Sequence, residues 1–176
     1  MGTNNDSTKW YALYVLTGQE DKVRKILELA FGDQLKVIVP KRELKERKAG
    51  TWRIVKKNLF PGYVFLKGII STETYYSIKS LPVAARLLKD EDGPLKIHDS
   101  EISVLRIFFE TDDGNVKISK AYKENDVIRI VEGPLSGLEG IIQSFDIRKG
   151  RAKVKIDLLG STKTIQLGVE LIDKIQ

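Results

Sequence analysis

The sequence lacks cysteine altogether and contains a single histidine, His98. Without thiols the chain can form neither disulfides nor thiolate metal sites, which is typical of a reducing cytoplasm. One histidine cannot supply an ordinary zinc site or a Ser-His-Asp or Cys-His catalytic set. Neighbouring carboxylates such as Asp112-Asp113 diverge on regular structure, and the glycines match no nucleotide fingerprint. We therefore expect a binding protein with no cofactor and no metal, rather than an enzyme.

Long hydrophobic runs are also absent. No apolar stretch approaches the roughly 20 residues that a membrane-spanning helix needs. Residues 1–8 contain neither the basic head nor the apolar stretch of a secretory signal. We predict that they form a disordered tail. We expect a cytoplasmic monomer with no membrane partner.

Basic charge is concentrated in one segment. The chain has a net charge of +6, and residues 41–57, with eight basic and two acidic side chains, account for all of it. A patch that follows a phosphate backbone and a solvated charged hairpin both explain this concentration. The basic side chains are Lys41, Arg42, Lys45, Arg47, Lys48, Arg53, Lys56 and Lys57.

The first 110 residues mix strand and helix patterns. Apolar runs predict strands at 10–16, 35–40, 63–66 and 83–88. Helices are predicted after Thr17, where Thr17-Gly18-Gln19-Glu20 has capping-box spacing, from the hydroxyl-rich residues 71–74 to Leu81, and after Asp99. Ala49-Gly50 predicts the tip of a long hairpin.

The last third of the chain has the pattern of a small antiparallel barrel. Apolar and polar residues alternate from Asn125, a Gly133-Pro134 turn follows, and alternation resumes after Gly137. Five strands are predicted near 126–131, 138–146, 151–158, 162–167 and 170–175. The predicted class is α+β, with an antiparallel sheet and helices at 9–110, a linker at 111–120 and a five-stranded SH3-like barrel at 121–176.

Two separate stretches resemble the NusG family of transcription elongation factors. Asn125–Ile142 is similar to the family's KOW module. Trp10–Val15 and Phe60–Leu66 resemble the family's N-terminal domain. They precede the KOW-like stretch in the order, and at the separation, that the family shows. The resemblance implies an N-terminal domain that binds RNA polymerase, followed by a KOW barrel.

Aromatic side chains form the first candidate surface. Two-residue alternation puts Trp10 and Tyr14 on one side of their strand. The same spacing puts Tyr63 and Phe65 on one side of another. These rings could be core, or they could line an exposed cleft for a partner helix. The resemblance implies the second role, because the family seats helices of RNA polymerase in a hydrophobic hollow.

Hydroxyl groups form the second candidate surface. Ser71, Thr72 and Thr74 occupy a region that in the family faces the opposite lobe of the polymerase, so the resemblance implies a second polymerase contact. Capping of a short helix explains the same hydroxyls equally well.

A basic strand forms the third candidate surface. Residues 151, 153 and 155 share one strand face, while Ala152, Val154 and Ile156 share the other and should close the barrel core. The basic face could contact RNA, or it could be a solvated edge strand protected by lysines. The basic side chains here are Arg148, Lys149, Arg151, Lys153 and Lys155.

One region departs from the family pattern. Leu81–Leu88 lacks the tryptophan and the Gly-Val-x-x-Phe-Val-Gly stretch that general members carry. This favours a specialised paralog, of which RfaH and LoaP are examples. The resemblance implies that such paralogs act as processive antiterminators, and that members of the LoaP type read an RNA hairpin in the leader transcript.

We therefore expect an elongation and antitermination factor. Its expected partners are RNA polymerase, nascent RNA including a leader hairpin, and upstream or non-template DNA near the hairpin 41–57. Two alternatives remain: a general factor whose barrel binds a ribosomal protein or Rho, and a ribosome-associated RNA-binding protein.

Overall fold

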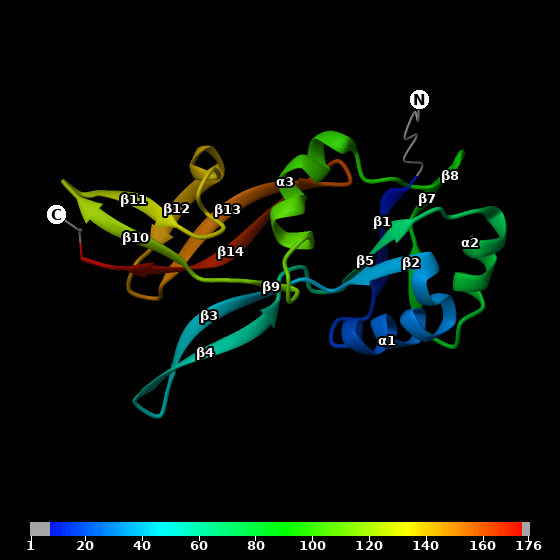
Figure 1. The fold of residues 1–176 in the computed structure, drawn as a ribbon, viewed down its shortest axis with the longest axis horizontal. Coiled ribbons are helices and arrows are strands. Elements are labelled where there is room, and N and C mark those ends of the chain that lie inside the picture. The colour runs from blue at the N-terminus through cyan, green and yellow to red at the C-terminus, as the bar shows by residue number, and fades with distance from the viewer. Residues whose placement is uncertain (1–7, 174–176) are drawn as a thin grey trace. The chain divides into compact units, whose positions relative to one another are not determined.

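The computed structural model describes residues 8–173, which form two compact units. The first unit contains the described residues up to Val39 together with Pro61–Ile102. The second contains Pro40–Phe60 and the described residues from Ser103 onward. Each unit is therefore built from two stretches of the chain, which Figure 1 traces by colour. The predicted disordered tail lies outside the described residues, apart from Thr8.

A four-stranded sheet forms the frame of the first unit. Its strand order is β2-β5-β1-β6, and β1 pairs antiparallel with both β5 and β6. The strands are β1 Lys9–Val15, β2 Leu35–Ile38, β5 Tyr63–Gly68 and β6 Ala85–Leu87. A separate two-stranded ribbon pairs β7 Lys89–Asp90 with β8 Gly93–Pro94.

The core of the first unit lies between one face of this sheet and helix α1, Glu20–Phe31. Alternation along β1 and β5 sends Tyr11 and Val64 into this core, where they meet Leu27 from the apolar stripe of α1. A second helix, α2, spans Thr72–Lys79 and buries Ile78 in the same core. Helix α1 ends at Gly32, which has a φ of 52°, and a 3₁₀ turn covers Gly32–Gln34.

The basic segment of the second unit forms the predicted hairpin. Strand β3, Lys41–Lys48, pairs in full register with β4, Thr51–Asn58. The two connecting residues, Ala49 and Gly50, both have positive φ (50° and 79°), as a two-residue hairpin turn requires. On its other side, β3 pairs in parallel with the short strand β9, Asn115–Val116.

The second unit also contains a curled five-stranded sheet. This sheet is consistent with the predicted KOW-like domain, and together with the first unit it confirms the predicted α+β class. Its strand order is β11-β10-β14-β13-β12, and β10 and β14 are parallel. The strands are β10 Ser119–Glu124, β11 Val127–Glu132, β12 Ile142–Asp146, β13 Arg151–Leu158 and β14 Ser161–Leu171, with a 3₁₀ turn at Glu139–Ile141. Part of β14 runs beside β3, as Figure 1 shows.

The last two predicted strands are wrong in one respect, because 162–167 and residues 170 and 171 belong to the single strand β14. Residues 172 and 173 follow outside any strand, and residues 174–176 lie outside the described chain. The prediction left residues 168–169 between two strands. The structure shows what the glycine at position 168 does: a Cβ there would lie 2.6 Å from the backbone oxygen of Glu43. The glycine permits close approach of β14 to β3 within a continuous strand.

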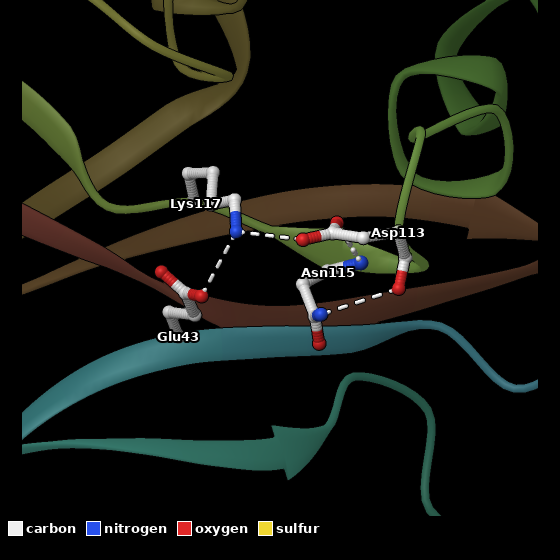
Figure 2. A network of polar contacts seen from close by, with 4 residues as sticks. All are labelled: Glu43, Asp113, Asn115 and Lys117. Atoms are coloured by element: carbon white, nitrogen blue, oxygen red, sulfur yellow. Dashed lines mark hydrogen bonds and ion pairs between the residues drawn. The ribbon is translucent and has the colours of Figure 1, made fainter.

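The segment predicted as an interdomain linker contains regular structure. Strand β9 and the beginning of β10 both fall within 111–120. The preceding helix α3 covers Asp99–Phe109, close to its predicted position. Figure 2 shows that Lys117 in this segment bridges Glu43 and Asp113. The placement of the domain boundary at this segment stays a prediction.

Candidate functional site

Two tyrosines at the end of paired strands form an accessible aromatic pair. The register of β1 and β5 places Tyr14 opposite Tyr63. Their ring centroids are 4.8 Å apart in an edge-to-face arrangement, and the Tyr63 hydroxyl donates to the Tyr14 hydroxyl over 3.4 Å. Tyr14 is 37% exposed and Tyr63 is half-buried. The pair therefore presents both ring surface and hydroxyl groups to solvent.

Of the two alternatives for the strand aromatics, Trp10 and Phe65 follow the core alternative and do not line an exposed cleft. Trp10 is 3% exposed, and the ammonium group of Lys67 lies 5.7 Å from the centroid of its ring. Phe65 is fully buried, and its ring stacks parallel to that of Tyr63 at 6.0 Å. Burial of such large rings is favourable, so an aromatic strand face is covered wherever other groups reach it. A role of either residue in polymerase binding stays a prediction.

The backbone around the tyrosine pair is fixed by a buried carboxylate. Glu20 is 1% exposed; its Oε1 accepts a hydrogen bond from the Gly62 N–H and its Oε2 accepts one from the Gly18 N–H, both at 2.8 Å. The N–H of Val15 also donates to the Gly62 oxygen at 2.9 Å. Because Gly62 directly precedes Tyr63, this carboxylate helps to position the aromatic pair.

The predicted capping box at the start of α1 is not formed. The helix begins at Glu20 after Gln19, whose side chain makes no capping bond within the described part of the chain. The Glu20 side chain, predicted to serve the helix terminus, instead joins the two glycine loops. Sequence spacing identified Glu20 as a local capping residue, whereas its partner Gly62 is 42 residues away.

The hydroxyl-rich corner caps helix α2. The Ser71 hydroxyl accepts a hydrogen bond from the Thr74 N–H at 3.1 Å, as an N-cap does, and the two side-chain oxygens lie 3.0 Å apart. Ser71 and Thr72 are exposed, and Thr74 is half-buried. This geometry confirms the capping role, while the second polymerase contact stays a prediction.

Part of the basic charge on the hairpin is neutralised within the second unit. Lys57 pairs with Glu46 at 2.6 Å, and Lys45 pairs with Glu170. The hydrogen bond from Lys57 and the nearby charge of Arg151 hold the pKa of the Glu46 carboxyl below its usual range. Four other exposed or half-buried basic side chains form no ion pair with the described residues: Arg47, Lys48, Arg53 and Lys56.

Sequence reasoning missed two apolar side chains on the basic hairpin. Trp52 is 55% exposed and Ile54 is 59% exposed, and both lie on β4. An aromatic ring among basic residues is a common feature of surfaces that bind single-stranded nucleic acids. The presence of Trp52 within the segment 41–57 was the available signal.

The predicted alternation along β13 is confirmed. Ala152, Val154 and Ile156 are buried, whereas Lys153 and Lys155 are exposed. Arg151 differs from the other two basic residues, because its side chain is only 12% exposed. Its Nη1 donates to the Lys45 backbone oxygen at 3.1 Å, and its Nη2 lies 3.7 Å from the Glu46 carboxylate. Arg148 and Lys149, in the turn before β13, are exposed.

The described residues 8–173 offer neither a cluster of metal ligands nor a membrane-spanning helix. They contain no group of three or more histidine, aspartate or glutamate side chains that could hold a metal ion. No helix among them is both long and apolar enough to cross a membrane.

Comparison with known proteins assigns this chain to a family. The family model described as transcription termination factor nusG matches residues 8–106, more than half of the sequence. The chain belongs to the NusG family. This agrees with the resemblance seen in Trp10–Val15 and Phe60–Leu66.

Relatives of this NusG-family chain align with it over nearly its whole length. Proteins named transcription termination/antitermination protein NusG are 26% identical in Helicobacter pylori (94% of this chain, 98% of that protein) and 28% identical in Campylobacter jejuni (95% and 97%). The Haemophilus influenzae protein of the same name is 27% identical, with coverage of 98% and 97%. A solved structure of Thermotoga maritima NusG superimposes with a TM-score of 0.57 at 24% identity, covering 93% of this chain and 94% of that one, and shows that the fold is shared.

Proposed function

We propose that this chain is a transcription elongation factor that binds RNA polymerase through its first unit and nucleic acid through its second, and that it promotes antitermination. Membership of the NusG family and the function for which its relatives are named support the transcription role. The observation that carries the polymerase contact is the accessible pair Tyr14–Tyr63, held in place through Glu20.

The tyrosine pair fits an apolar partner helix. Aromatic rings supply large contact area with little loss of side-chain freedom, and they dominate the energy of many interfaces. The two hydroxyls at the rim can bond polar groups of the partner. Because Glu20 fixes the loop at Gly62, little ordering of the backbone is needed when the partner binds.

A binding assay with core RNA polymerase tests this proposal. Replacing Tyr14 and Tyr63 together by alanine should weaken binding by about 2 kcal/mol, roughly 30-fold. Leu29→Ala is the matched control, because Leu29 is 88% exposed on α1 and its loss also removes exposed apolar surface. Equal affinity of the double variant and the control would reject the tyrosine pair as the docking site.

The second unit supplies the proposed nucleic-acid contact. Exposed basic side chains on β13 and on the hairpin favour RNA or the upstream or non-template DNA as ligands, because phosphate contacts dominate such binding. Transcription across a terminator, with and without this protein and a candidate leader RNA, tests antitermination. Read-through that depends on the leader would support a specialised paralog of the RfaH or LoaP type.

The full-length match to general NusG proteins favours a second candidate function, that of a housekeeping factor. In that case the five-stranded unit would bind a ribosomal protein or Rho, and RNA affinity would not depend on sequence. Pull-down of Rho or ribosomal protein by the full chain, together with read-through that ignores the leader, would support this alternative. Co-purification with ribosomes and not with polymerase would instead support a ribosome-associated role.

A further inference from the structure

The two basic segments of the sequence meet at one cavity. A cavity of about 400 Å³ lies within the second unit, between the hairpin and the strands β12, β13 and β14. Five basic side chains line it: Arg42, Lys57, Lys149, Arg151 and Lys153. The fold therefore brings together residues that are more than a hundred positions apart in the chain.

Positive charge at this cavity is only partly compensated. The carboxylates of Glu46 and Asp146 are the acidic groups in its lining, so five cations face two anions. Glu46 is already shared by Lys57 and Arg151, at 2.6 and 3.7 Å. No carboxylate of the described chain pairs with Arg42, Lys149 or Lys153, which leaves a local excess of cations.

Arg42 is the most constrained of these cations. Its Nη1 donates to the backbone oxygen of Gln166 at 2.5 Å, which fixes the guanidinium on β14. Its Nε is buried and has no hydrogen-bond partner among the residues that the structure describes. Burial and the charge of the nearby Arg151 lower the pKa of Arg42. An unsatisfied buried donor beside a second guanidinium is unfavourable unless an anion occupies the space.

We propose that this cavity binds a phosphate group, with Arg42 and Arg151 as its central donors and Lys149 and Lys153 at its edge. A phosphate offers several acceptor oxygens in different directions, which matches donors arriving from β3, β13 and the preceding turn. The volume is within the range of small-ligand sites, so the sugar attached to the phosphate also fits.

This inference deepens the proposed nucleic-acid contact and depends on that proposal for the expected source of the phosphate, which is an RNA backbone. A free nucleotide carries the same group, so the test must separate the two. The cavity also differs from the simple basic row on β13. Lys155 belongs to that row but does not line the cavity, whereas Lys153 belongs to both.

Fluorescence anisotropy of the full chain with a short labelled single-stranded RNA tests the cavity. Arg42→Gln and Lys153→Gln should each weaken RNA binding roughly tenfold, because each removes a charge-assisted contact. Lys155→Gln removes the same charge from the same strand face and should change binding less than twofold. Tripolyphosphate should compete with RNA for the wild type and lose this effect in Arg42→Gln.

The half-buried Arg42 requires a check on folding. Thermal unfolding of every variant provides it, and Lys153→Gln, at an exposed position, keeps the test valid if Arg42→Gln is unstable. Equal effects of Lys153→Gln and Lys155→Gln on RNA binding, with no competition by tripolyphosphate, would reject the cavity as the phosphate-binding site. RNA would then bind a diffuse basic surface.

Two more measurements complete the test. One identifies the source of the phosphate, and the other distinguishes failure of this inference from failure of the proposed function. Tighter binding of RNA than of ATP assigns a backbone phosphate, and the reverse assigns a free nucleotide; either result retains the phosphate cavity. Polymerase binding by Lys153→Gln should equal that of the wild type. Loss of the cavity effect with polymerase binding intact would reject this inference alone, whereas absence of polymerase binding by the wild type would reject the proposed function.

Discussion

The Nη1 atom of Arg151 donates a hydrogen bond to the backbone oxygen of Lys45 at 3.1 Å, across 106 positions of the chain. This bond joins the five-stranded sheet to the basic hairpin within the second unit. It also directs a cation of β13 toward the hairpin and away from the exposed row of Lys153 and Lys155. The two basic segments are therefore structurally coupled.

Glu20 should be important for the stability of the first unit. Glu20→Ala removes both acceptors of the Gly18 and Gly62 N–H groups, so we expect the free energy of unfolding to fall by about 2–4 kcal/mol. Glu28→Ala is the control, because the ion pair of Glu28 with Arg24 is at the surface and is worth less than about 1 kcal/mol. Urea unfolding followed by circular dichroism measures both; similar values would contradict the bridging role.

Gly168 should tolerate no side chain. In Gly168→Ala the new Cβ would lie 2.6 Å from the Glu43 oxygen and 2.9 Å from Ile118 Cγ1, so β14 must move away from β3. We expect a loss of about 1–3 kcal/mol in the free energy of unfolding. Gly140→Ala is the matched control, since a Cβ at Gly140 meets nothing within 4 Å. A thermal shift that is equal for the two variants would show that the close approach is absent.

The network in Figure 2 predicts a specific pH dependence. The hydrogen bonds from the Lys117 ammonium and the Asn115 N–H lower the pKa of Asp113 from 3.8 to about 2. Because the folded-state pKa is depressed, the contribution of Asp113 to stability is present above about pH 3.8 and is lost as the pH falls toward 2. Carboxyl NMR titration should give this low midpoint, and Lys117→Gln should raise it toward 3.8. An unchanged midpoint in the variant would rule out Lys117 as the main cause.

Ser71 allows capping to be separated from binding. Ser71→Ala should cost about 1 kcal/mol of stability by removing the acceptor for the Thr74 N–H. Ser71→Asp supplies another good N-cap acceptor and should restore most of this loss. If the hydroxyl also contacts polymerase, affinity measured by pull-down will fall in both variants. Affinity that follows stability alone would assign Ser71 to capping only.

The local elements were largely predictable because their signals are local. The hairpin predicted at 41–57 from Ala49-Gly50 spans 41–58 in the structure, and helix α3 begins at Asp99, close to its predicted start. Strand β13 has unambiguous period-two alternation. The continuity of β14 through Gly168 was not predictable, since a glycine that ends a strand and one that admits a neighbouring backbone look the same in sequence.

For the candidate sites, the sequence indicated which residue types are present, but it did not indicate their exposure or their contacts. Sequence alternation placed Trp10 and Tyr14 on one strand face, but only the structure shows that the first is buried and the second is exposed. Likewise, the charge of Arg151 was evident, whereas its bonds to the hairpin were not.

The sequence by itself determined the α+β class, the hairpin and the location of the positive charge, because periodicity, turn residues and composition act over a few neighbouring positions. Tertiary structure alone decided that Tyr14 meets Tyr63, that Glu20 reaches Gly62 and that Arg42 lies near Arg151. Each of these contacts joins residues that are tens to more than a hundred positions apart. Strand register and backbone approach set such contacts, and neither is encoded in any short stretch of the chain.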